Sequence, residues 1–249
     1  MIDTHCHIYS EYYDDISSLI DDIKKNGINK IIINGCDMKS NLEVLKLTKK
    51  YDIVYGALGF HPTELDNYSD DSIKWLEENI NNDKIVAIGE IGLDYHYENA
   101  DKEKQIKAFN EQLQLAEKYK KPIIVHTRDA IQDTYNILKK YKLKGSIHAF
   151  SGSLEMAKEF INLGYYIGVG GVCTFKNAKN IVNVIKNIST EYILLETDSP
   201  YLTPEPYRGK INTPKNISII ADKIAEIKQI NISEVVDVTT DNANALFDF

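Results

Sequence analysis

The chain opens with a strand-like stretch that ends in two histidines: residues 2–8 read Ile-Asp-Thr-His-Cys-His-Ile. In an extended strand, residues i and i+2 point to the same face, so His5 and His7 can reach one point while Cys6 faces the other way. Imidazole is a common ligand of divalent metals. The stretch therefore predicts a β-strand that presents two metal-binding side chains at its carboxyl end.

The same arrangement, a short apolar run that ends near a polar residue, recurs along the whole chain. The runs end at residues 7, 35, 60, 90, 126, 148, 170 and 198, so successive ends lie 22 to 36 residues apart. Unbroken apolar runs such as residues 31–33 favour a parallel sheet that is covered on both faces. We predict strands at 2–7, 30–35, 54–60, 85–90, 123–126, 146–149, 166–170 and 193–196. We predict helices at 16–26, 42–51, 72–79, 102–119, 130–141, 154–162, 178–187, 217–228 and 233–246.

Eight strand–helix units in 249 residues match the size of a (β/α)8 TIM barrel. An open doubly wound sheet is the alternative, and it is weakened because no Gly-x-Gly-x-x-Gly turn follows the first strand. No linker divides the chain, so we predict a single domain over residues 1–249. Two longer interruptions, 92–101 and 197–214, follow carboxyl ends of strands, and this is the face on which such a barrel carries its site.

The composition narrows the class of protein. No apolar run of about 18 residues occurs, so no membrane span is expected. The first residues do not resemble a signal peptide. Three cysteines without metal-finger spacing indicate a reduced, cytoplasmic setting with buried thiols. A net charge of −8 argues against broad binding to a nucleic-acid backbone, although it leaves room for a small positive site. We expect a cytoplasmic monomer.

Ionisable side chains gather at the predicted carboxyl ends of the strands, which converge on the axis of a barrel. We predict that six of them form one centre for two divalent metal ions: His5, His7, Glu90, His126, His148 and Asp198. In this prediction, His5, His7 and Asp198 hold one ion. His126 and His148 hold the second, and Glu90 bridges the two. Glu90 and Asp198 are also the predicted catalytic residues, because Asp198 would lie beside the attacking water and could take its proton. Glu196 shares a face with Asp198 and could be a ligand of a further ion or a residue that orients another ligand.

Arginine is rare in this chain: only Arg128 and Arg208 occur among 29 basic residues. Arg128 directly follows the strand of His126, and Arg208 lies in the proline-rich interruption. An arginine can bind phosphate through two parallel hydrogen bonds, whereas lysine offers a point charge. We therefore predict anion-binding side chains near the centre, with surface ion pairs as the alternative. Six tyrosines fall near the same loops, where they could stack on nucleobases or lie by chance: Tyr9, Tyr12, Tyr13, Tyr95, Tyr97 and Tyr201.

Seven stretches around these residues carry a recognisable pattern. They are Ile-Asp-Thr-His-Cys-His (2–7), Gly-Phe-His-Pro (59–62), Ala-Ile-Gly-Glu-Ile-Gly-Leu-Asp-Tyr (87–95), Pro-Ile-Ile-Val-His-Thr-Arg-Asp-Ala (122–130), His-Ala-Phe-Ser-Gly-Ser (148–153), Leu-Glu-Thr-Asp-Ser-Pro-Tyr-Leu (195–202) and Asn-Ala-Asn-Ala-Leu-Phe (242–247). In this order they resemble the TatD-type metal-dependent deoxyribonucleases of the amidohydrolase-like barrel superfamily. The resemblance spans essentially the whole chain.

The resemblance implies a (β/α)8 hydrolase whose divalent metals are held by the same six residues. Mixed imidazole and carboxylate ligands leave Mg, Mn or Zn as the expected ions. It implies hydrolysis of phosphodiester bonds in DNA, as a 3′→5′ exodeoxyribonuclease that acts on DNA 3′ ends and in some members at abasic sites. It also implies that His61, Arg128 and Arg208 contact phosphate. Two positions depart from the family pattern. His96 replaces the second tyrosine of Leu-Asp-Tyr-Tyr, as a mouth ligand or a surface residue, and Ile211 replaces the second arginine of Arg-Gly-Lys-Arg-Asn.

Two other functions compete with the nuclease. The first is a small-molecule amidase or lactonase of the same barrel class. Some such enzymes bridge their metals with a modified lysine, and Glu90 at the end of the fourth strand points away from that group. The second is a non-catalytic metal binder, which predicts a closed coordination shell, and the presence of both Glu196 and Asp198 argues against it.

Overall fold

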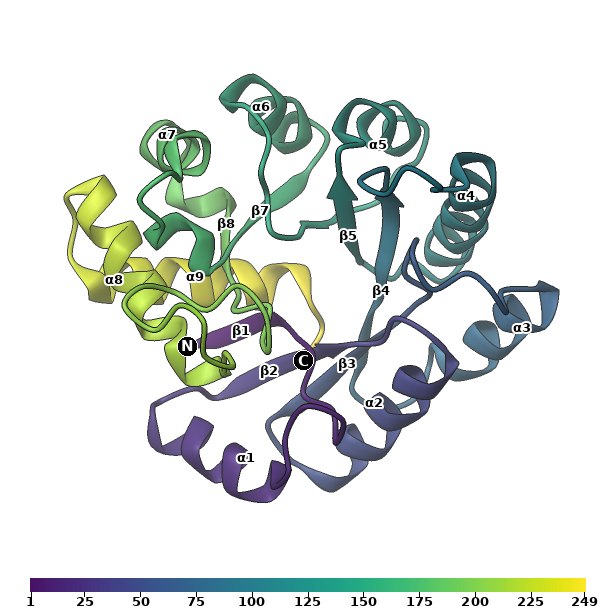
Figure 1. Ribbon diagram of the computed structural model, residues 1–249, viewed down its shortest axis with the longest axis horizontal. Helices are drawn as coiled ribbons and strands as arrows, with labels where there is room; N and C mark the ends of the chain where they lie inside the picture. Colours follow the sequence, from purple (N-terminus) through teal and green to yellow (C-terminus); the bar gives the residue numbers. More distant parts are fainter.

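The computed structural model describes residues 1–249 and shows eight parallel strands, ordered β1 to β8 in one sheet, with helices around the outside (Figure 1). The strands are β1 Ile2–Cys6, β2 Lys30–Asn34, β3 Val54–Leu58, β4 Ile85–Asp94, β5 Ile123–Arg128, β6 Gly145–Ile147, β7 Tyr165–Val169 and β8 Ile193–Leu195. The helices are α1 Ile16–Lys25, α2 Met38–Lys50, α3 Asp70–Asn79, α4 Lys102–Tyr119, α5 Ile131–Leu138, α6 Leu154–Asn162, α7 Lys179–Asn187, α8 Ile217–Lys228 and α9 Ile232–Leu246. Three short 3-10 helices complete the chain, namely η1 Gly171–Thr174, η2 Thr190–Tyr192 and η3 Pro214–Asn216.

The sheet closes where β1 meets the segment that follows β8. The backbone N–H of His7 donates to the carbonyl of Ser199 at 2.6 Å, and the N–H of Asp198 donates to the carbonyl of His5 at 2.9 Å. The buried Asp3 carboxylate accepts from the N–H of Thr197 at 3.0 Å. These bonds bring the first and last strands together, and the predicted (β/α)8 barrel is confirmed.

The amino-terminal end of the barrel is closed by α9, which crosses behind the strands in Figure 1. Ala243, Leu246 and Phe247 form one buried cluster with strand residues that include Ile2 and Ile32. Hydrogen bonds also hold α9 in place. The side-chain amide of Asn242 donates to the carbonyls of Thr190 and Ile193, both at 2.8 Å. The carboxyl-terminal end of the barrel is not closed in this way and carries the polar residues.

The largest difference from the predicted elements lies in β4. The sequence predicts a strand that ends at Glu90 and an interruption over 92–101, but the strand continues to Asp94. It continues because Gly92 pairs with His126 and Asp94 with Arg128 across β5, while the Asp94 backbone is held by the side chain of Gln105 through two bonds of 2.8 Å. The loop is therefore shorter than predicted, and Asp94 belongs to the strand.

The helices lie close to their predicted bounds, and α4, α6 and α8 coincide with them. The exception is α2, which begins at Met38 rather than at residue 42. Asp37 caps it, because its carboxylate accepts from the N–H of Ser40 at 2.8 Å while the Ser40 hydroxyl accepts from the Asp37 N–H at 2.9 Å. No helix of this structure combines the length and the apolar character that crossing a membrane requires.

Candidate metal centre

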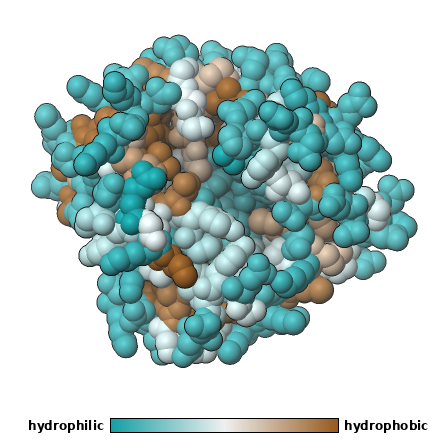
Figure 2. All heavy atoms as spheres, in the orientation of Figure 1, coloured by the Kyte–Doolittle hydropathy of each residue, from teal (hydrophilic) through white to brown (hydrophobic).

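A cavity of about 620 Å³ opens at the carboxyl ends of the strands. Figure 2 shows it as a hollow near the middle of this face of the molecule, bordered largely by hydrophilic residues. Five of the six predicted metal ligands line it, namely His7, Glu90, His126, His148 and Asp198. His5 is fully buried, and its ring stacks on that of His148 with centroids 3.5 Å apart. The structure thus brings all six side chains together.

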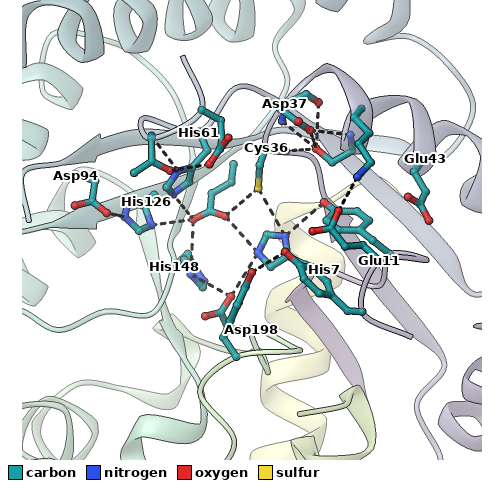
Figure 3. A pocket seen from close by; sticks show the side chains of 18 of the residues that line it. His7, Glu11, Cys36, Asp37, Glu43, His61, Asp94, His126, His148 and Asp198 are labelled. Carbon is teal, nitrogen blue, oxygen red and sulfur yellow. Dashed lines mark hydrogen bonds and ion pairs between the residues drawn. The ribbon is translucent and has the colours of Figure 1, made fainter. Parts of the chain in front are cut away.

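Glu90 lies close to four of these imidazoles, of which Figure 3 labels His7, His126 and His148. Its Oε2 is 3.3 Å from Nε2 of His5 and 3.4 Å from Nε2 of His7. Its Oε1 is 2.9 Å from Nδ1 of His126 and 3.8 Å from Nε2 of His148. The two oxygens therefore face two different sets of imidazoles, as a carboxylate that bridges two ions must do.

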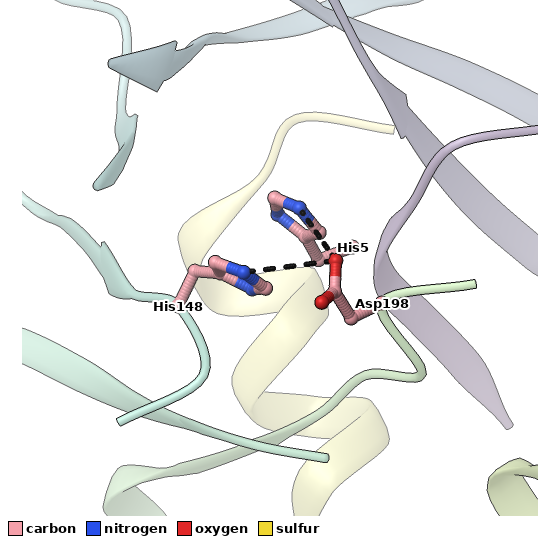
Figure 4. Close-up of side chains that lie close together, drawn as sticks. All are labelled: His5, His148 and Asp198. Carbon is pink, nitrogen blue, oxygen red and sulfur yellow. Dashed lines mark ion pairs between the residues drawn. The ribbon is translucent and has the colours of Figure 1, made fainter. Parts of the chain in front are cut away.

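Asp198 contacts three imidazoles from the opposite side. Its Oδ1 lies 3.6 Å from Nε2 of His5, 3.5 Å from Nε2 of His7 and 3.7 Å from Nε2 of His148 (Figure 4 shows the first and last). The backbone of Asp198 has φ +54°, a left-handed conformation that aspartate tolerates better than most residues. His148 thus lies beside His5 and Asp198, whereas the sequence groups it with His126, whose ring centroid is 6.3 Å away.

The spacing of these atoms fits a shared divalent ion. Ligand atoms about 2.1 Å from an ion lie roughly 3.0–3.4 Å apart at octahedral or tetrahedral angles. The Nε2 atoms of His5 and His7 are 3.0 Å apart, and both lie within 3.4 Å of Glu90. Burial raises the pKa of Glu90, but the surrounding imidazoles outweigh it and hold that pKa well below its usual value. Burial also raises the pKa of Asp198, but the neighbouring imidazoles outweigh burial and lower it. Both carboxyl groups are therefore ionised.

The tautomers of two histidines favour metal binding. Nδ1 of His7 lies 3.1 Å from the carbonyl oxygen of Asn34, which can only accept, so the proton is on Nδ1 and the lone pair of Nε2 faces the centre. Nδ1 of His148 lies 3.1 Å from Oε1 of Glu196, and its Nε2 also faces the centre. Glu196 is fully buried and also accepts from the N–H of Ala149 at 2.6 Å. Glu196 therefore orients His148 from behind.

Asp94 is part of the site, although no role is predicted for it from the sequence. Its Oδ2 lies 3.1 Å from Nε2 of His126, on the side of the ring away from Glu90. It holds His126 as Glu196 holds His148. The signal was present in the sequence, because Glu90, Gly92 and Asp94 alternate along one strand and so share a face once β4 is extended beyond Glu90.

Cys36 corrects the expectation that the thiols are buried. Cys6 and Cys173 are buried, but Cys36 is only partly buried and lines the cavity. Its Sγ lies 3.8 Å from Nδ1 of His7 and 4.0 Å from Oε2 of Glu90. Burial raises the pKa of the Cys36 thiol, so it stays protonated. It follows β2, the strand whose predicted end carried no polar ligand.

His61 lines the cavity and differs from the other imidazoles in its tautomer. Its Nδ1 accepts from the N–H of Thr63 at 3.2 Å, so the proton lies on Nε2, which is 3.6 Å from Oε1 of Glu90. Burial and the neighbouring His126 lower the pKa of His61 to about 3, so the ring is neutral. A neutral ring that presents an N–H suits a phosphate oxygen better than a metal ion.

The two arginines occupy different places. Arg128 is exposed and lines the cavity, with Cζ 6.0 Å from the centre of the Tyr97 ring. Arg208 lies outside this cavity, with Cζ 4.0 Å above the ring of Phe175. Neither guanidinium forms an ion pair, so the alternative of surface ion pairs does not hold. His96 also lies outside the cavity, where its Nδ1 is 2.9 Å from Asp129.

Four of the six predicted mouth tyrosines line the cavity, namely Tyr9, Tyr12, Tyr97 and Tyr201. Tyr12 and Tyr201 come from loops after the first and last strands, and their hydroxyls form a hydrogen bond of 2.8 Å. Tyr13 and Tyr95 do not line it. The hydroxyl of Tyr13 donates to the carbonyl of Asn212 at 2.7 Å, which makes it part of the packing.

Comparisons with known proteins match this chain over nearly its whole length. The family model described as TatD related DNase matches residues 2–248. The chain is 38% identical over 251 residues to YabD of Bacillus subtilis, which is described as an uncharacterized metal-dependent hydrolase, and the match covers 99% of this chain and 98% of that protein. The crystal structure of YjjV, a TatD homologue from Escherichia coli, superposes with a TM-score of 0.95 at 33% identity and covers 100% of this chain and 98% of that one.

A more distant solved structure supports the same conclusion. The hydrolase TatD family protein of Entamoeba histolytica has a TM-score of 0.83 and 27% identity, with coverage of 99% of this chain and 97% of that one. The convergence of buried imidazoles and carboxylates also matches use of a divalent metal. The chain belongs to the TatD family of metal-dependent hydrolases.

Proposed function

We propose that this hydrolase cleaves phosphodiester bonds of DNA, as a 3′→5′ exodeoxyribonuclease that also cuts at abasic sites. One observation carries the proposal: two ionised carboxylates, Glu90 and Asp198, lie among imidazoles on the floor of a cavity that Arg128 also lines without a partner of its own. The family description, TatD related DNase, supports DNA as the substrate class.

The proposed ligands are the six predicted residues, and the proposed cofactor is a pair of divalent ions, Mg, Mn or Zn. The separate environments of the two Glu90 oxygens support two ions rather than one. When bound, such ions activate water and polarise a phosphoryl group. Imidazole and carboxylate together suit zinc or manganese, and magnesium would prefer the positions richest in oxygen.

The side chains then divide the work of hydrolysis. Asp198 is ionised and accepts the proton of the attacking water as the new P–O bond forms. The N–H on Nε2 of His61 and the guanidinium of Arg128 stabilise the charge that grows on the phosphoryl oxygens while the bond to the leaving sugar oxygen breaks, and Asp198 passes its proton to that oxygen. Glu90 contacts one set of imidazoles through each of its oxygens and so fixes their relative positions. The proposed form is a cytoplasmic monomer, and the three free cysteines agree with a reducing compartment.

The test is a time course of chelator-treated protein on 5′-labelled single-stranded DNA, with Mg²⁺, Mn²⁺ or Zn²⁺ added back. A metal-dependent ladder that shortens from the 3′ end, and that a 3′-terminal phosphorothioate blocks, is expected. A duplex with one abasic site tests the second activity. The matched pair of variants is His126→Ala, which should lose at least about 100-fold in rate, and His96→Ala, which removes a histidine outside the cavity and should change little.

A protein that binds metal but cleaves no DNA with any ion would contradict the nuclease proposal. Hydrolysis of cyclic esters or amides by the same preparation would then support the amidase or lactonase alternative.

A further inference from the structure

The metal centre spans the seam at which the barrel closes. Each strand pairs with the next from β1 to β8, but β8 and β1 share no continuous ladder, and the two sides meet in an isolated bridge between Cys6 and Ser199. His5 and His7 lie on the β1 side of this seam, and Asp198 lies beyond the end of β8 on the other side. A regular strand register therefore does not set the distance between these ligands, and side-chain contacts across the seam can set it instead.

Asp3 makes such contacts from β1. Its side chain is fully buried and does not line the cavity over the metal centre. Oδ1 accepts from the N–H of His5 at 3.3 Å on its own strand and from the N–H of Thr197 at 3.0 Å across the seam. Oδ2 lies 2.6 Å from the hydroxyl oxygen of Thr197. A buried carboxyl group is costly unless its oxygens are hydrogen-bonded, and both oxygens of Asp3 contact Thr197.

Thr197 is held at each of its polar atoms. Its N–H and its hydroxyl contact Asp3, and its carbonyl accepts from the side-chain amide of Asn212 at 2.8 Å. The hydroxyl oxygen also lies 2.6 Å from that of Ser199. All four of these residues are fully buried. The residues immediately before and after Asp198 are therefore fixed in place.

The segment that Thr197 anchors carries two carboxylates of the centre. Oε1 of Glu196 lies 3.1 Å from Nδ1 of His148, and Oδ1 of Asp198 lies 3.7 Å from Nε2 of the same ring. The Thr197 side chain between them contacts Asp3 instead. Asp198 also has φ +54°, a conformation that residues other than glycine rarely adopt. A contact that holds Thr197 thus holds the carboxylates on both sides of it.

We propose that Asp3 and Thr197 are positioning residues of the metal centre. They fix the segment of Asp198 against the strand of His5 and His7, and so set the spacing of the ligands that share an ion. Neither residue touches the metal or the substrate. The inference is independent of DNA as the substrate, because it concerns how tightly, and in what geometry, the centre binds metal.

The test uses metal-free protein and Co²⁺, whose absorption spectrum reports the geometry of its ligands. Thr197→Val keeps the size and branching of the side chain but removes the hydroxyl, whereas Thr197→Ser keeps the hydroxyl. Thr197→Val should bind Co²⁺ at least about tenfold more weakly and with an altered spectrum, as expected for the loss of a residue that orients ligands. Thr197→Ser should stay within about threefold of wild type and keep its spectrum.

Thr4→Val is the matched control for stability. The hydroxyl of Thr4 donates to the carbonyl of Leu195 at 2.9 Å, so this variant removes a buried hydrogen bond of the same seam outside the segment of Asp198. Its melting temperature should fall about as much as that of Thr197→Val. Its Co²⁺ affinity and spectrum should nevertheless match those of wild type.

Wild-type affinity and spectrum in Thr197→Val would overturn the proposal. An equal loss of Co²⁺ affinity in Thr4→Val would also overturn it, because the seam would then act through stability alone. If Thr197→Val does not fold, Asp3→Asn provides the same test, since the amide keeps the shape but offers one acceptor oxygen instead of two. Asp3→Asn should weaken Co²⁺ binding and alter the spectrum, and unchanged binding would overturn the proposal.

Discussion

At the scale of single residues, the site depends on which nitrogen of each histidine carries the proton. The carbonyl of Asn34 places a proton on Nδ1 of His7, and the carboxylate of Glu196 lies 3.1 Å from Nδ1 of His148, so that Nε2 of each faces the centre. The N–H of Thr63 has the opposite effect on His61 and leaves it a hydrogen-bond donor toward the cavity. These histidines thus take different roles because of neighbouring residues that are not among the six predicted ligands.

The first prediction concerns Asp94, which holds His126 at 3.1 Å. Asp94→Asn keeps the shape of the side chain but removes the charged acceptor, so His126 loses its orientation. Metal affinity, measured by competition with a chromogenic chelator, should fall about 10- to 100-fold, with a matching loss of activity at low metal concentration. The control is Asp129→Asn, which removes the partner of His96 outside the cavity. Equal metal affinity in wild type and Asp94→Asn would show that Asp94 does not position a ligand.

The second prediction concerns the protons that metal binding displaces from His148. In the metal-free protein, burial lowers the pKa of His148, but Glu196, Asp198 and Glu90 outweigh it and raise that pKa to about 9. At pH 7 the imidazole is therefore protonated, and a metal must displace the proton. Metal binding should release protons, and apparent affinity should rise as pH increases toward 9. Calorimetry in two buffers with different ionisation enthalpies counts the protons, and a count of zero at pH 7 would refute the prediction.

The same pKa has the opposite effect on the stability of the metal-free protein. Because the folded-state pKa of His148 lies above the usual value of about 6.5, its contribution is complete below pH 6.5 and is lost as the pH rises through about 9. The melting temperature of the metal-free protein should therefore fall between pH 7 and pH 9, while that of the metal-loaded protein should fall less.

At the scale of elements, β7 supports the site without contributing a ligand. A Cβ at Gly168 would lie 2.4 Å from Oε2 of Glu196, so only glycine leaves room for the carboxylate that orients His148. Gly170, two residues later on the chain, has space for a Cβ, whose nearest neighbour would be the Glu196 carbonyl oxygen at 3.5 Å. The backbone of one strand thus sets the position of a side chain on the next.

The third prediction uses this pair of glycines. Gly168→Ala should displace Glu196, release His148 and weaken metal binding about tenfold. Gly170→Ala is the matched control, because it adds the same methyl group nearby without a clash. Metal affinity by calorimetry distinguishes the two variants. The explanation fails if they bind metal equally well, or if Gly168→Ala affects only the melting temperature.

Most elements could be predicted from the sequence because the strands are short apolar runs that recur at regular intervals. Unbroken apolar runs with regular spacing indicated the barrel, and the polar residues at their ends indicated the metal site. β4 was the exception, because Gly92 reads as a turn residue until its pairing with His126 is known. Asp94 was missed for the same reason, since it shares a face with Glu90 only when β4 is extended beyond Gly92.

Side-chain placement across loops could not be predicted from the sequence either. Arg128 and Arg208 look equivalent as rare arginines near strand ends, but one lines the metal cavity and the other stacks on Phe175 in a separate cavity. Cys36 likewise lies within 4.0 Å of Glu90 because β2 and β4 both point toward the barrel axis. Contacts between residues more than 50 positions apart in the sequence leave no periodic signal.

At the scale of the whole molecule, the two ends of the barrel are specialised. Apolar residues of α9 close one end, and ionisable residues occupy the other. A metal site of buried carboxylates and imidazoles opposes folding before the metal binds, because charged groups are costly to bury. The apolar end offsets this cost at a distance from the chemistry, so stability and activity should be separable.

The fourth prediction tests that separation. Phe247 is 1% exposed beneath the strands, and Phe247→Ala should destabilise the protein by about 3–5 kcal/mol. Ile232→Ala, at the exposed start of α9, is the control and should cost less than about 1 kcal/mol. Denaturant unfolding measures both. Metal affinity of Phe247→Ala at low temperature should stay within about twofold of wild type, and a large loss would show that the two ends are coupled.

The bridging role of Glu90 is tested by a titration of metal-free protein with Mn²⁺ while cleavage of single-stranded DNA is followed, in wild type and in Glu90→Gln. Wild-type activity is expected to saturate near two equivalents of metal, because the two oxygens of Glu90 face two sets of ligands. Glu90→Gln, which keeps the size of the side chain, should retain less than about 1% of the activity. Wild-type cleavage by Glu90→Gln with metal still bound would show that Glu90 does not bridge two ions.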